Sequence, residues 1–429
     1  MTSSFTGALR KHLRWQRALL ERLKNVRQRQ NTSRFLVLRP GDKLTVCDSK
    51  GMKDVRAHCY RASAPRRTRP TGVHWDPFVI QGRSDLSRPI PGLGNVALSL
   101  ISAAATAIVS RRVLLLENFS ASGMSFGDDL RELLVESSGW APYLAAAGYS
   151  ETDGFMAHDD YTAFNTLCSS DLRHTPQARV WRIFSNQYFL PLLMLNPYHG
   201  RQMDAFAEKL ESGGQSLWTP GLQALWTPNA RLAARIAAFK AKAGFELGSY
   251  VAMHVRINFA DQRDGSRRLH QAITCARTRL VASNTTKLFV ATMYASNRRA
   301  LKEALATDGI SVHWLGRAME AQGESREGSD SALADMVLMG GAREVLVTPG
   351  STFGYVAQGL AGRRAITYGG THTSRELVGP QQAQCSSVPT SEPNFHFLKH
   401  ALRLEACKAG LRNARARGSE IYQRSSMQH

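Results

Sequence analysis

Two short segments carry residues whose types and spacing suit the binding of a phosphate group. In the first, an apolar run at residues 345–347 ends in the turn Pro349-Gly350, and a helix then begins at Ser351 or Thr352. The first turn of a helix has unpaired N–H groups, and serine or threonine hydroxyl groups commonly cap them. The carboxyl ends of strands in a doubly wound sheet face the ligand crevice, so these N–H and hydroxyl groups would point at bound phosphate. An ordinary helix cap without a ligand explains the same residues equally well.

The second segment is a predicted strand at residues 250–256, which ends in two polar groups, His254 and Arg256. Residues two apart on a strand point to the same face, so the imidazole and guanidinium groups lie together. Arginine is permanently charged and binds a diphosphate through two parallel hydrogen bonds. The alternative is a surface arginine at the end of a strand.

Asp335 is a third candidate, sixteen residues before Ser351 on a helix that is otherwise apolar around it. Its carboxylate could accept the paired N–H donors on the edge of a guanine ring, or it is a charge that the helix dipole favours. The chain contains no GxxxxGK[ST], complete GxGxxG, HExxH or DxD motif. Since DxD is the usual signature of a metal-held diphosphate, we predict that no metal ion and no other cofactor is required.

The composition limits the kinds of partner. The 429 residues include 55 Lys and Arg against 34 Asp and Glu, a formal net charge of +21, which favours anionic partners. No RNA-binding motif with interleaved aromatic residues accompanies this charge, and we predict no nucleic-acid partner. The six cysteines form no CxxC pair, which argues against a structural zinc site. Three glycosylation sequons begin at Asn31, Asn118 and Asn284.

The positions of the apolar residues predict two α/β units. A turn at 91–95, a helix at 96–109 and a strand at 113–116 form the first Rossmann-like unit, and a second series of strands alternating with helices begins at residue 250. The apolar run at 96–109 is too short to span a membrane, and no signal peptide or spanning helix is predicted. The basic helix at 5–26 is either a solvated surface helix or a helix that binds a membrane surface or a partner.

These elements predict an α/β fold with mostly parallel sheets and two units facing each other across a cleft. Residues 1–75 are expected to form the basic N-terminal helix and a surface linker, and residues 411–429 a basic tail. Residues 76–246 are expected to form an N-terminal, acceptor-side α/β domain. Residues 247–410 are expected to form the C-terminal, nucleotide-binding Rossmann-like domain.

Several blocks, in order along the chain, resemble the plant fucosyltransferase family typified by xyloglucan α-1,2-fucosyltransferases. They are residues 91–115 (PGLGNVALSLISAAATAIVSRRVLL), 180–197 (VWRIFSNQYFLPLLMLNP), 251–256 (VAMHVR) and 351–362 (STFGYVAQGLAG). The run Glu392-Pro393-Asn394-Phe395-His396, between Cys385 and Cys407, is similar to the C-terminal end of the family. The STFGYVAQG and SNQYF runs are highly specific to the family, whereas the glycine turn is not.

The resemblance implies a GT-B-like fold and an inverting glycosyltransferase that moves fucose from GDP-fucose to a glycan hydroxyl. It implies that Arg256, the catalytic residue, binds the diphosphate and that Asp335 contacts the guanine. It also implies a cell-wall enzyme of the Golgi and a disulfide between Cys385 and Cys407. The remaining substrate-binding residues that it implies are His254, Ser351, Thr352, Phe353 and Gly354 on the donor side, and Gly92, Gly94 and Asn95 on the opposite side of the cleft.

Two positions differ from the family pattern. Val96 replaces the arginine of the usual Gly-Asn-Arg opening, and His254 stands where plant members often have glutamine. We therefore do not extend the family's xyloglucan acceptor to this chain, and we assign no residue as the catalytic base. Two alternatives stay open: a sugar-nucleotide-binding protein without transfer activity, and a protein that binds nucleic acid or an anionic surface through its positive charge.

Overall fold

The computed structural model describes most of the elements that the sequence predicts. The described residues are 4–25, 35–40, 93–116, 153–156, 161–175, 180–185, 187–209, 215–257, 262–316, 326–368, 385–388, 392–393 and 404–416. Residues 1–41 and 91–429 form one compact unit, and residues 42–90 form a second unit. Gly92 and all of residues 42–90, which include the later part of the surface linker predicted within residues 1–75, lie outside the described residues.

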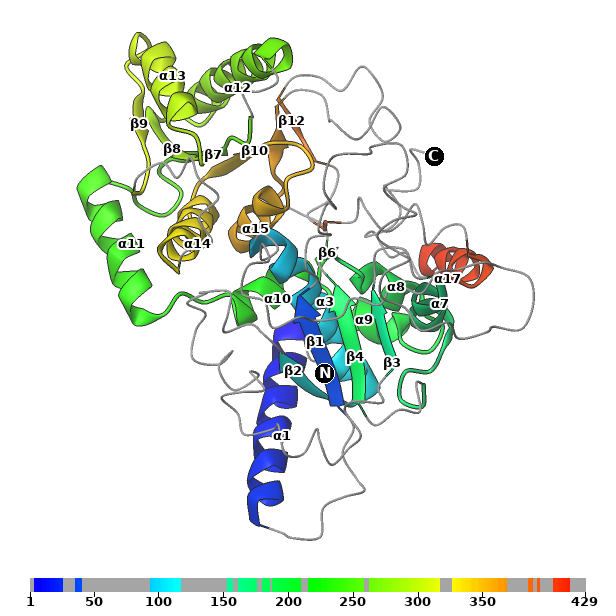
Figure 1. The fold of residues 1–429 in the computed structure, drawn as a ribbon. Helices are drawn as coiled ribbons and strands as arrows, with labels where there is room; N and C mark the ends of the chain where they lie inside the picture. The colour runs from blue at the N-terminus through cyan, green and yellow to red at the C-terminus, as the bar shows by residue number, and fades with distance from the viewer. Residues whose placement is uncertain are drawn as a thin grey trace, which may run out of the picture. The chain divides into compact units, whose positions relative to one another are not determined.

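The first sheet of the larger unit is parallel. Its described strands are β1 (Phe35–Pro40), β2 (Val113–Leu116), β3 (Asp153–Met156) and β4 (Val180–Ser185), in the order β2-β1-β4-β3 (Figure 1). The strand β1 lies within residues 1–75, for which the sequence predicted only a helix and a linker. Its run of four apolar residues is typical of a strand between two neighbours, but it is too short to stand out beside an arginine-rich segment.

Helix α3 (Leu93–Ser110) is the central helix of this part of the protein. Nearly all of its residues are buried, which confirms the prediction of a buried helix at 96–109. Within the described residues it is the helix long and apolar enough to cross a membrane, but 83% of its most apolar window is buried inside the protein. The burial identifies α3 as a core helix.

Helix α1 (Phe5–Asn25) is part of the core and not a peripheral helix. Phe5 and Leu9 are completely buried, and the helix contacts α3. The side-chain amide of Gln16 accepts a hydrogen bond from the backbone N–H of Leu114 at 3.0 Å and donates to its carbonyl at 2.8 Å. Gln16 thus pairs with the edge strand β2 as a backbone amide would.

The second sheet confirms the predicted series of strands and helices. Its described strands are β7 (Val251–His254), β8 (Lys287–Ala291), β9 (Ser311–His313), β10 (Glu344–Val347), β11 (Ile366–Thr367) and β12 (Ser386–Ser387). They lie in the order β12-β11-β10-β7-β8-β9, parallel except for β12. The connecting helices are α12 (Gln262–Ala282), α13 (Ala295–Ala306), α14 (Arg326–Gly340) and α15 (Thr352–Ala361).

The order of these strands places a topological switch point between β7 and β10. The chain runs outward from β7 through β8 to β9, then returns to β10 on the other side of β7. In such a sheet the connections diverge at the switch point and leave a crevice at the carboxyl ends of the two strands. The residues after His254 and Val347 therefore lie where this class of sheet binds its ligands.

Further helices and a small hairpin complete the unit. Helix α11 (Ala230–Ala243) follows its sequence signals closely, because the Asn229 side chain caps its N-terminus and Gly244 ends it in the left-handed conformation with φ of 63°. The other described elements are α7 (Tyr161–Ser169), α8 (Leu190–Leu195), α9 (Gly200–Phe206), β5 (Glu208–Lys209), β6 (Gln215–Ser216), α10 (Trp218–Leu225) and α17 (Glu405–Ala416).

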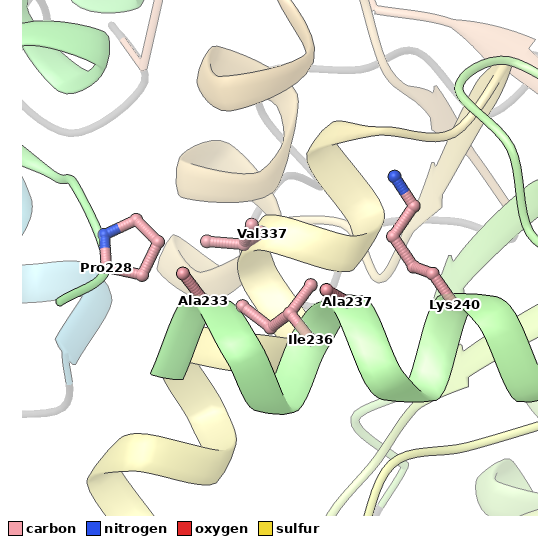
Figure 2. Close-up of a pocket in the computed structure, with 6 residues that line it drawn as sticks. All are labelled: Pro228, Ala233, Ile236, Ala237, Lys240 and Val337. Atoms are coloured by element: carbon pink, nitrogen blue, oxygen red, sulfur yellow. The ribbon is translucent and has the colours of Figure 1, made fainter. Parts of the chain in front are cut away.

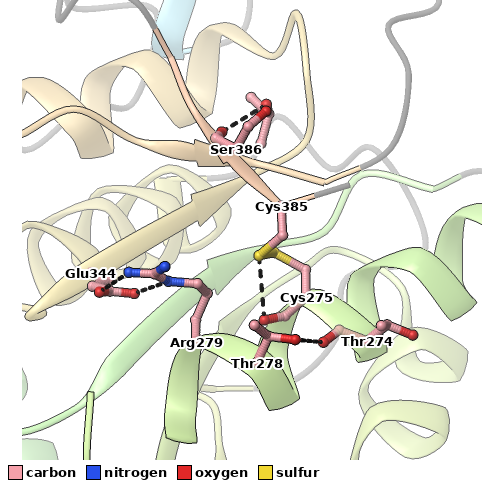
Figure 3. The surroundings of a disulfide bond; sticks show 8 residues. Thr274, Cys275, Thr278, Arg279, Glu344, Cys385 and Ser386 are labelled. Atoms are coloured by element: carbon pink, nitrogen blue, oxygen red, sulfur yellow. Dashed lines mark hydrogen bonds and ion pairs between the residues drawn. A yellow bond between two sulfur atoms is a disulfide. The ribbon is translucent and has the colours of Figure 1, made fainter. Parts of the chain in front are cut away.

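Two disulfides connect distant parts of the chain. Cys275 on α12 bonds to Cys385 beside β12 (Figure 3), and Cys168 on α7 bonds to Cys407 on α17. The pairing of Cys385 with Cys407 that the family resemblance implied is therefore wrong. Each of these two cysteines instead meets a partner on a helix that the tertiary structure brings beside it.

Candidate functional site

Arg256 lies just beyond the carboxyl end of β7 and is exposed. Its backbone N–H donates to the hydroxyl oxygen of Thr348 at 2.9 Å, which joins the end of β7 to the residue after β10. The hydroxyl group of Thr348 lies 3.1 Å from the carbonyl oxygen of His254, and the phenol of Tyr368 donates to the same carbonyl at 2.6 Å. The main chain that carries Arg256 is thus fixed while its guanidinium group faces solvent.

His254 is buried directly beside this arginine. Its ring stacks on Phe353 with centroids 4.7 Å apart and an interplanar angle of 18°. Burial, with a smaller contribution from the charge of Arg256, lowers the pKa of His254 to about 3, so the imidazole is neutral at physiological pH. Within the described part of the chain, its Nδ1 atom has no hydrogen-bond partner.

The turn after β10 has the geometry that its sequence predicted, with one informative difference. Ser351 is the N-cap residue of α15 and has the expected extended backbone. Its hydroxyl group does not cap the helix, however, and this buried oxygen finds no partner among the described residues. The hydroxyl group and the first N–H groups of α15 therefore resemble a phosphate-binding turn more than a closed cap.

The N-terminal turns of α3 and α15 touch each other. A Cβ atom on Gly94 would lie 2.5 Å from the backbone carbon of Thr352, so only glycine permits this approach. Asn95 follows in the first turn of α3 and is half-buried. Gly354 has a packing role, since a Cβ atom there would lie 2.8 Å from Cβ of Val347.

Asp335 lies in a second polar group, together with Arg298. Burial raises the pKa of Asp335 to about 8, although the nearby charges of Arg298 and Arg235 oppose that shift. The guanidinium group of Arg298 donates to the carbonyl oxygens of Gly316 at 3.0 Å and Thr292 at 3.1 Å. One carboxylate oxygen of Asp335 is buried without a partner among the described residues.

The structure thus brings together most of the candidates from the sequence. His254, Arg256, Ser351, Thr352 and Phe353 surround the carboxyl ends of β7 and β10, and Gly94 contacts this group from α3. The sequence interpretation did not include Thr348, Tyr368 or Arg298. Thr348 directly follows a recognised strand, which is a usable signal, but nothing in the sequence connects Tyr368 with His254.

A contrasting set of polar groups surrounds Glu392, from the run that resembles the C-terminal end of the family. Its buried carboxylate accepts hydrogen bonds from the Ser216 hydroxyl at 2.7 Å and from the backbone N–H groups of Leu217 and Trp218 at 2.8 and 3.1 Å. It also accepts from the hydroxyl group of Tyr188, in the SNQYF run. Glu392 therefore joins two family-like runs and caps α10.

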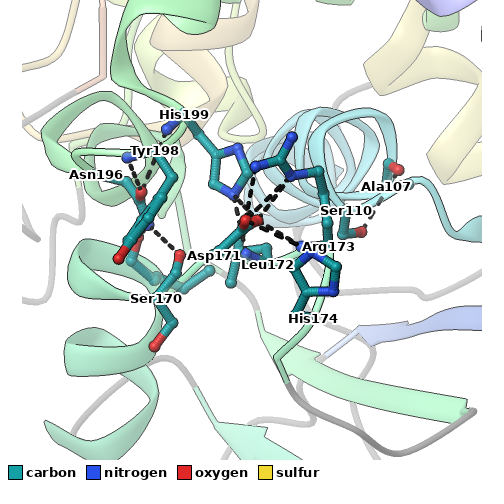
Figure 4. A network of polar contacts seen from close by, with 11 residues as sticks. Ala107, Ser110, Ser170, Asp171, Leu172, Arg173, His174, Asn196, Tyr198 and His199 are labelled. Atoms are coloured by element: carbon teal, nitrogen blue, oxygen red, sulfur yellow. Dashed lines mark hydrogen bonds and ion pairs between the residues drawn. The ribbon is translucent and has the colours of Figure 1, made fainter.

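A second closed network lies between α7 and α9 (Figure 4). Asp171 accepts from Nε of Arg173 at 2.8 Å, which lowers the pKa of the carboxyl group, and lies 3.6 Å from the imidazole of His199. The Nε2 atom of His199 accepts from the backbone N–H of Leu172 at 2.9 Å, so the ring is held as a neutral acceptor. These groups use one another and the nearby backbone as partners.

The structure also contains an open, apolar pocket of about 390 Å³ between α11 and α14 (Figure 2). It is lined by Pro228, Ala233, Ile236, Ala237, Lys240 and Val337. None of the candidate residues lines it. The described residues contain no group of three or more His, Cys, Asp or Glu side chains arranged to hold a metal ion.

Comparison with known structures first identifies the class of fold. A solved structure of a mutant of Arabidopsis thaliana FUT1 in complex with GDP matches with a TM-score of 0.56 and 16% identity. The match covers 90% of this chain and 83% of that chain. The chain therefore shares the fold of that protein. Fucosyltransferase NodZ from Bradyrhizobium matches more weakly, with a TM-score of 0.42 and 14% identity over 79% of this chain and 96% of that chain.

Comparison of sequences then gives a particular relative. The chain is 25% identical over 348 residues to galactoside 2-alpha-L-fucosyltransferase of Arabidopsis thaliana, and it is thus similar to a plant-type fucosyltransferase, as its sequence runs indicated. The match covers 71% of this chain and spans 62% of the relative's length. No protein-family model matches the chain.

Proposed function

We propose that this protein is a fucosyltransferase, which transfers fucose from GDP-fucose to a hydroxyl group of a glycan acceptor. The observation that carries the proposal is the exposed Arg256 at the switch point of the second sheet, bonded through its backbone to the turn that leads into α15. A diphosphate there would meet a bidentate cation, helix N–H groups and the hydroxyl group of Ser351, which has no partner within the described part of the chain. The similarity to a plant fucosyltransferase supports fucose as the sugar.

The proposed arrangement has two Rossmann-like domains that face a cleft, a GT-B-like enzyme. Residues 247–410 would bind the donor, with Arg256 on the diphosphate, Ser351 and Thr352 on its phosphate oxygens and Asp335 on the guanine. Residues 76–246 would bind the acceptor, with Gly92, Gly94 and Asn95 on that side. By its resemblance, we assign the enzyme to the Golgi and to the synthesis of cell-wall glycans.

The proposed reaction inverts the anomeric carbon and requires no metal ion. The acceptor oxygen forms a bond to the anomeric carbon, while the bond from that carbon to the diphosphate oxygen breaks and GDP leaves with the electron pair. The proton of the acceptor hydroxyl group is released to water as the new bond forms. Arg256 and the N-terminus of α15 stabilise the negative charge that develops on the leaving group. His254 is a poor candidate for the base, because its pKa of about 3 leaves the imidazole with little affinity for the acceptor proton.

The direct test is a donor panel of GDP-fucose, GDP-mannose and UDP-sugars, assayed with EDTA on a glycan array. We expect transfer from GDP-fucose alone, and unchanged transfer with the chelator. Arg256→Ala should lower kcat/KM for GDP-fucose by at least about 100-fold with an unchanged Tm, because a charge that contacts only the ligand is lost. Arg201→Ala, which removes another exposed arginine on α9, is the matched control and should keep wild-type activity.

Near-wild-type turnover in Arg256→Ala would reject this mechanism. Binding of GDP-fucose without transfer to any glycan or to water would favour the sugar-nucleotide-binding alternative.

The exposed face of α1 favours a second candidate function, binding to an anionic surface. Arg10, Lys11 and Arg14 are exposed there beside Trp15, which is 43% exposed. Salt-sensitive binding to anionic vesicles that is lost in the Arg10→Glu/Lys11→Glu/Arg14→Glu variant and retained in Arg256→Ala would support it. Equal binding by both variants would count against it.

A further inference from the structure

The end of β7 is held by side chains on the side where its backbone pairing with β10 stops, while on the other side the N–H of Val255 still donates to the carbonyl of Ala291 at 2.9 Å. β10 pairs with β7 up to Val347 and His254, and Pro349 has no N–H group with which to extend this pairing. Two hydroxyl groups, from Thr348 and Tyr368, supply hydrogen bonds at this point instead. We refer to these two side chains as the β7 brace.

The hydroxyl groups of the β7 brace bond to each other as well as to the backbone at the end of β7. The Tyr368 hydroxyl group donates to the His254 carbonyl at 2.6 Å, and the Thr348 oxygen accepts from the Arg256 N–H at 2.9 Å. The Thr348 hydroxyl hydrogen can point to the Tyr368 oxygen, 2.7 Å away, or to the His254 carbonyl, 3.1 Å away. Burial raises the pKa of Tyr368, so its hydroxyl group remains a donor.

The β7 brace fixes the backbone of Arg256, the residue whose position matters most for binding a ligand. The Arg256 side chain is long and exposed, so its reach toward a ligand depends on where its main chain is fixed. The β7 brace holds two backbone groups of this segment: the N–H of Arg256 itself and the carbonyl of His254, two residues earlier. Because binding is sensitive to small displacements of a charged contact, loosening these groups weakens the contact without removing it.

We propose that Thr348 and Tyr368 are positioning residues for Arg256, and that they hold its backbone in place for the diphosphate of the donor. The inference depends on the proposed function, because it requires Arg256 to bind a diphosphate. The competing explanation is a purely structural one, in which the two hydroxyl groups only join β7, β10 and β11.

The chain offers a matched control for the structural explanation. At the opposite end of β7, the buried hydroxyl group of Tyr250 also donates to a backbone carbonyl, that of Leu338. Tyr368→Phe and Tyr250→Phe therefore remove the same kind of hydrogen bond from the two ends of the second sheet. If the β7 brace positions Arg256, only Tyr368→Phe should weaken the binding of GDP.

The test is calorimetric titration of the full chain with GDP, together with the Tm of each variant. Thr348→Val should weaken GDP binding about tenfold, and Tyr368→Phe about threefold, as expected for lost hydrogen bonds that preorganise a charged contact. Thr348→Ser, which keeps the hydroxyl group, should restore wild-type affinity. Tyr250→Phe should lower the Tm and leave the affinity unchanged.

A double-mutant cycle with Arg256→Ala separates positioning from structure. If Thr348 acts through Arg256, Thr348→Val should have no further effect on GDP affinity once the guanidinium group is absent. The same fold-loss in both backgrounds, or no loss in the wild-type background, would overturn the inference while the donor site stands. Failure of the wild-type chain to bind GDP would instead reject the proposed function, and the role of the β7 brace with it.

Discussion

The polar groups around Glu392 and those at the carboxyl ends of β7 and β10 differ in where they find hydrogen-bond partners. The Glu392 carboxylate is buried and accepts from several donors that the fold supplies. At the second sheet, buried atoms of His254, Ser351 and Asp335 find no partner among the described residues. Both regions belong to sequence runs that resemble the same enzyme family.

We interpret this difference as one between residues that support the fold and residues that are available to a ligand. Buried atoms without a partner among the described residues also occur outside the second sheet, such as Oγ1 of Thr219 beside the Glu392 donors, so the interpretation requires the binding tests below. A buried polar atom without a partner costs free energy, so a folded protein retains few of them unless another molecule satisfies them. A buried carboxylate with a full set of donors has no capacity left for a substrate. Both regions resemble the family in sequence, and only their hydrogen bonding suggests that one supports the fold and the other binds a ligand.

The largest expected effect is on stability, from Glu392→Ala. The change leaves the N–H groups of Leu217 and Trp218 and the Tyr188 hydroxyl group without their acceptor, and should lower the free energy of unfolding by about 3 kcal/mol. Denaturant unfolding measures this loss, and GDP affinity below the transition should be unchanged. The exposed Glu303→Ala on α13 is the control. Weaker GDP binding with unchanged stability would reverse the roles that we assign.

Asp335→Asn should have the opposite pattern of effects to Glu392→Ala: higher stability at pH 8 and weaker GDP binding. The folded pKa of about 8 lies above the value of 3.8 for an unperturbed carboxyl group, so between these values the folded state holds a proton that the unfolded state has released. The wild-type protein therefore loses stability as the pH rises from about 4 to 8, and the neutral amide removes this loss.

The expected result for Asp335→Asn is a higher Tm at pH 8, little change at pH 4, and GDP binding weakened about tenfold as one hydrogen-bonding group of the site changes. Thermal unfolding at both pH values and GDP titration measure the two effects. Asp308→Asn, at an exposed carboxylate paired with Arg277, is the control. Unchanged GDP affinity would remove Asp335 from the donor site.

The smallest effect is expected for Ser351→Ala. Because the buried hydroxyl group does not cap α15, its removal should not lower the Tm, and GDP binding should weaken about fivefold through the loss of one hydrogen bond. Ser311→Ala on β9, where the hydroxyl group is exposed, is the control. A lower Tm with unchanged GDP affinity would show that Ser351 is an ordinary helix cap after all.

Local sequence signals predicted much of the second sheet and where the residues of its candidate site lie. Apolar runs bounded by turn residues identified β10 and α15, and the positions of His254, Arg256 and Ser351 followed from strand ends and a helix start. These signals are reliable here because strands and helices are marked by nearby residues. The strand β1 was missed because its pairing with β2 and β4 is a long-range property.

The sequence by itself determined which residue types stand at the carboxyl ends of β7 and β10, and therefore the kind of ligand that this edge can bind. Only the tertiary structure decided which polar groups remain open. It paired Cys275 with Cys385, satisfied Glu392 and brought Tyr368 to the His254 carbonyl. The physical reason is that a hydrogen bond or a disulfide between distant residues depends on distances in space, which no local pattern of residues specifies.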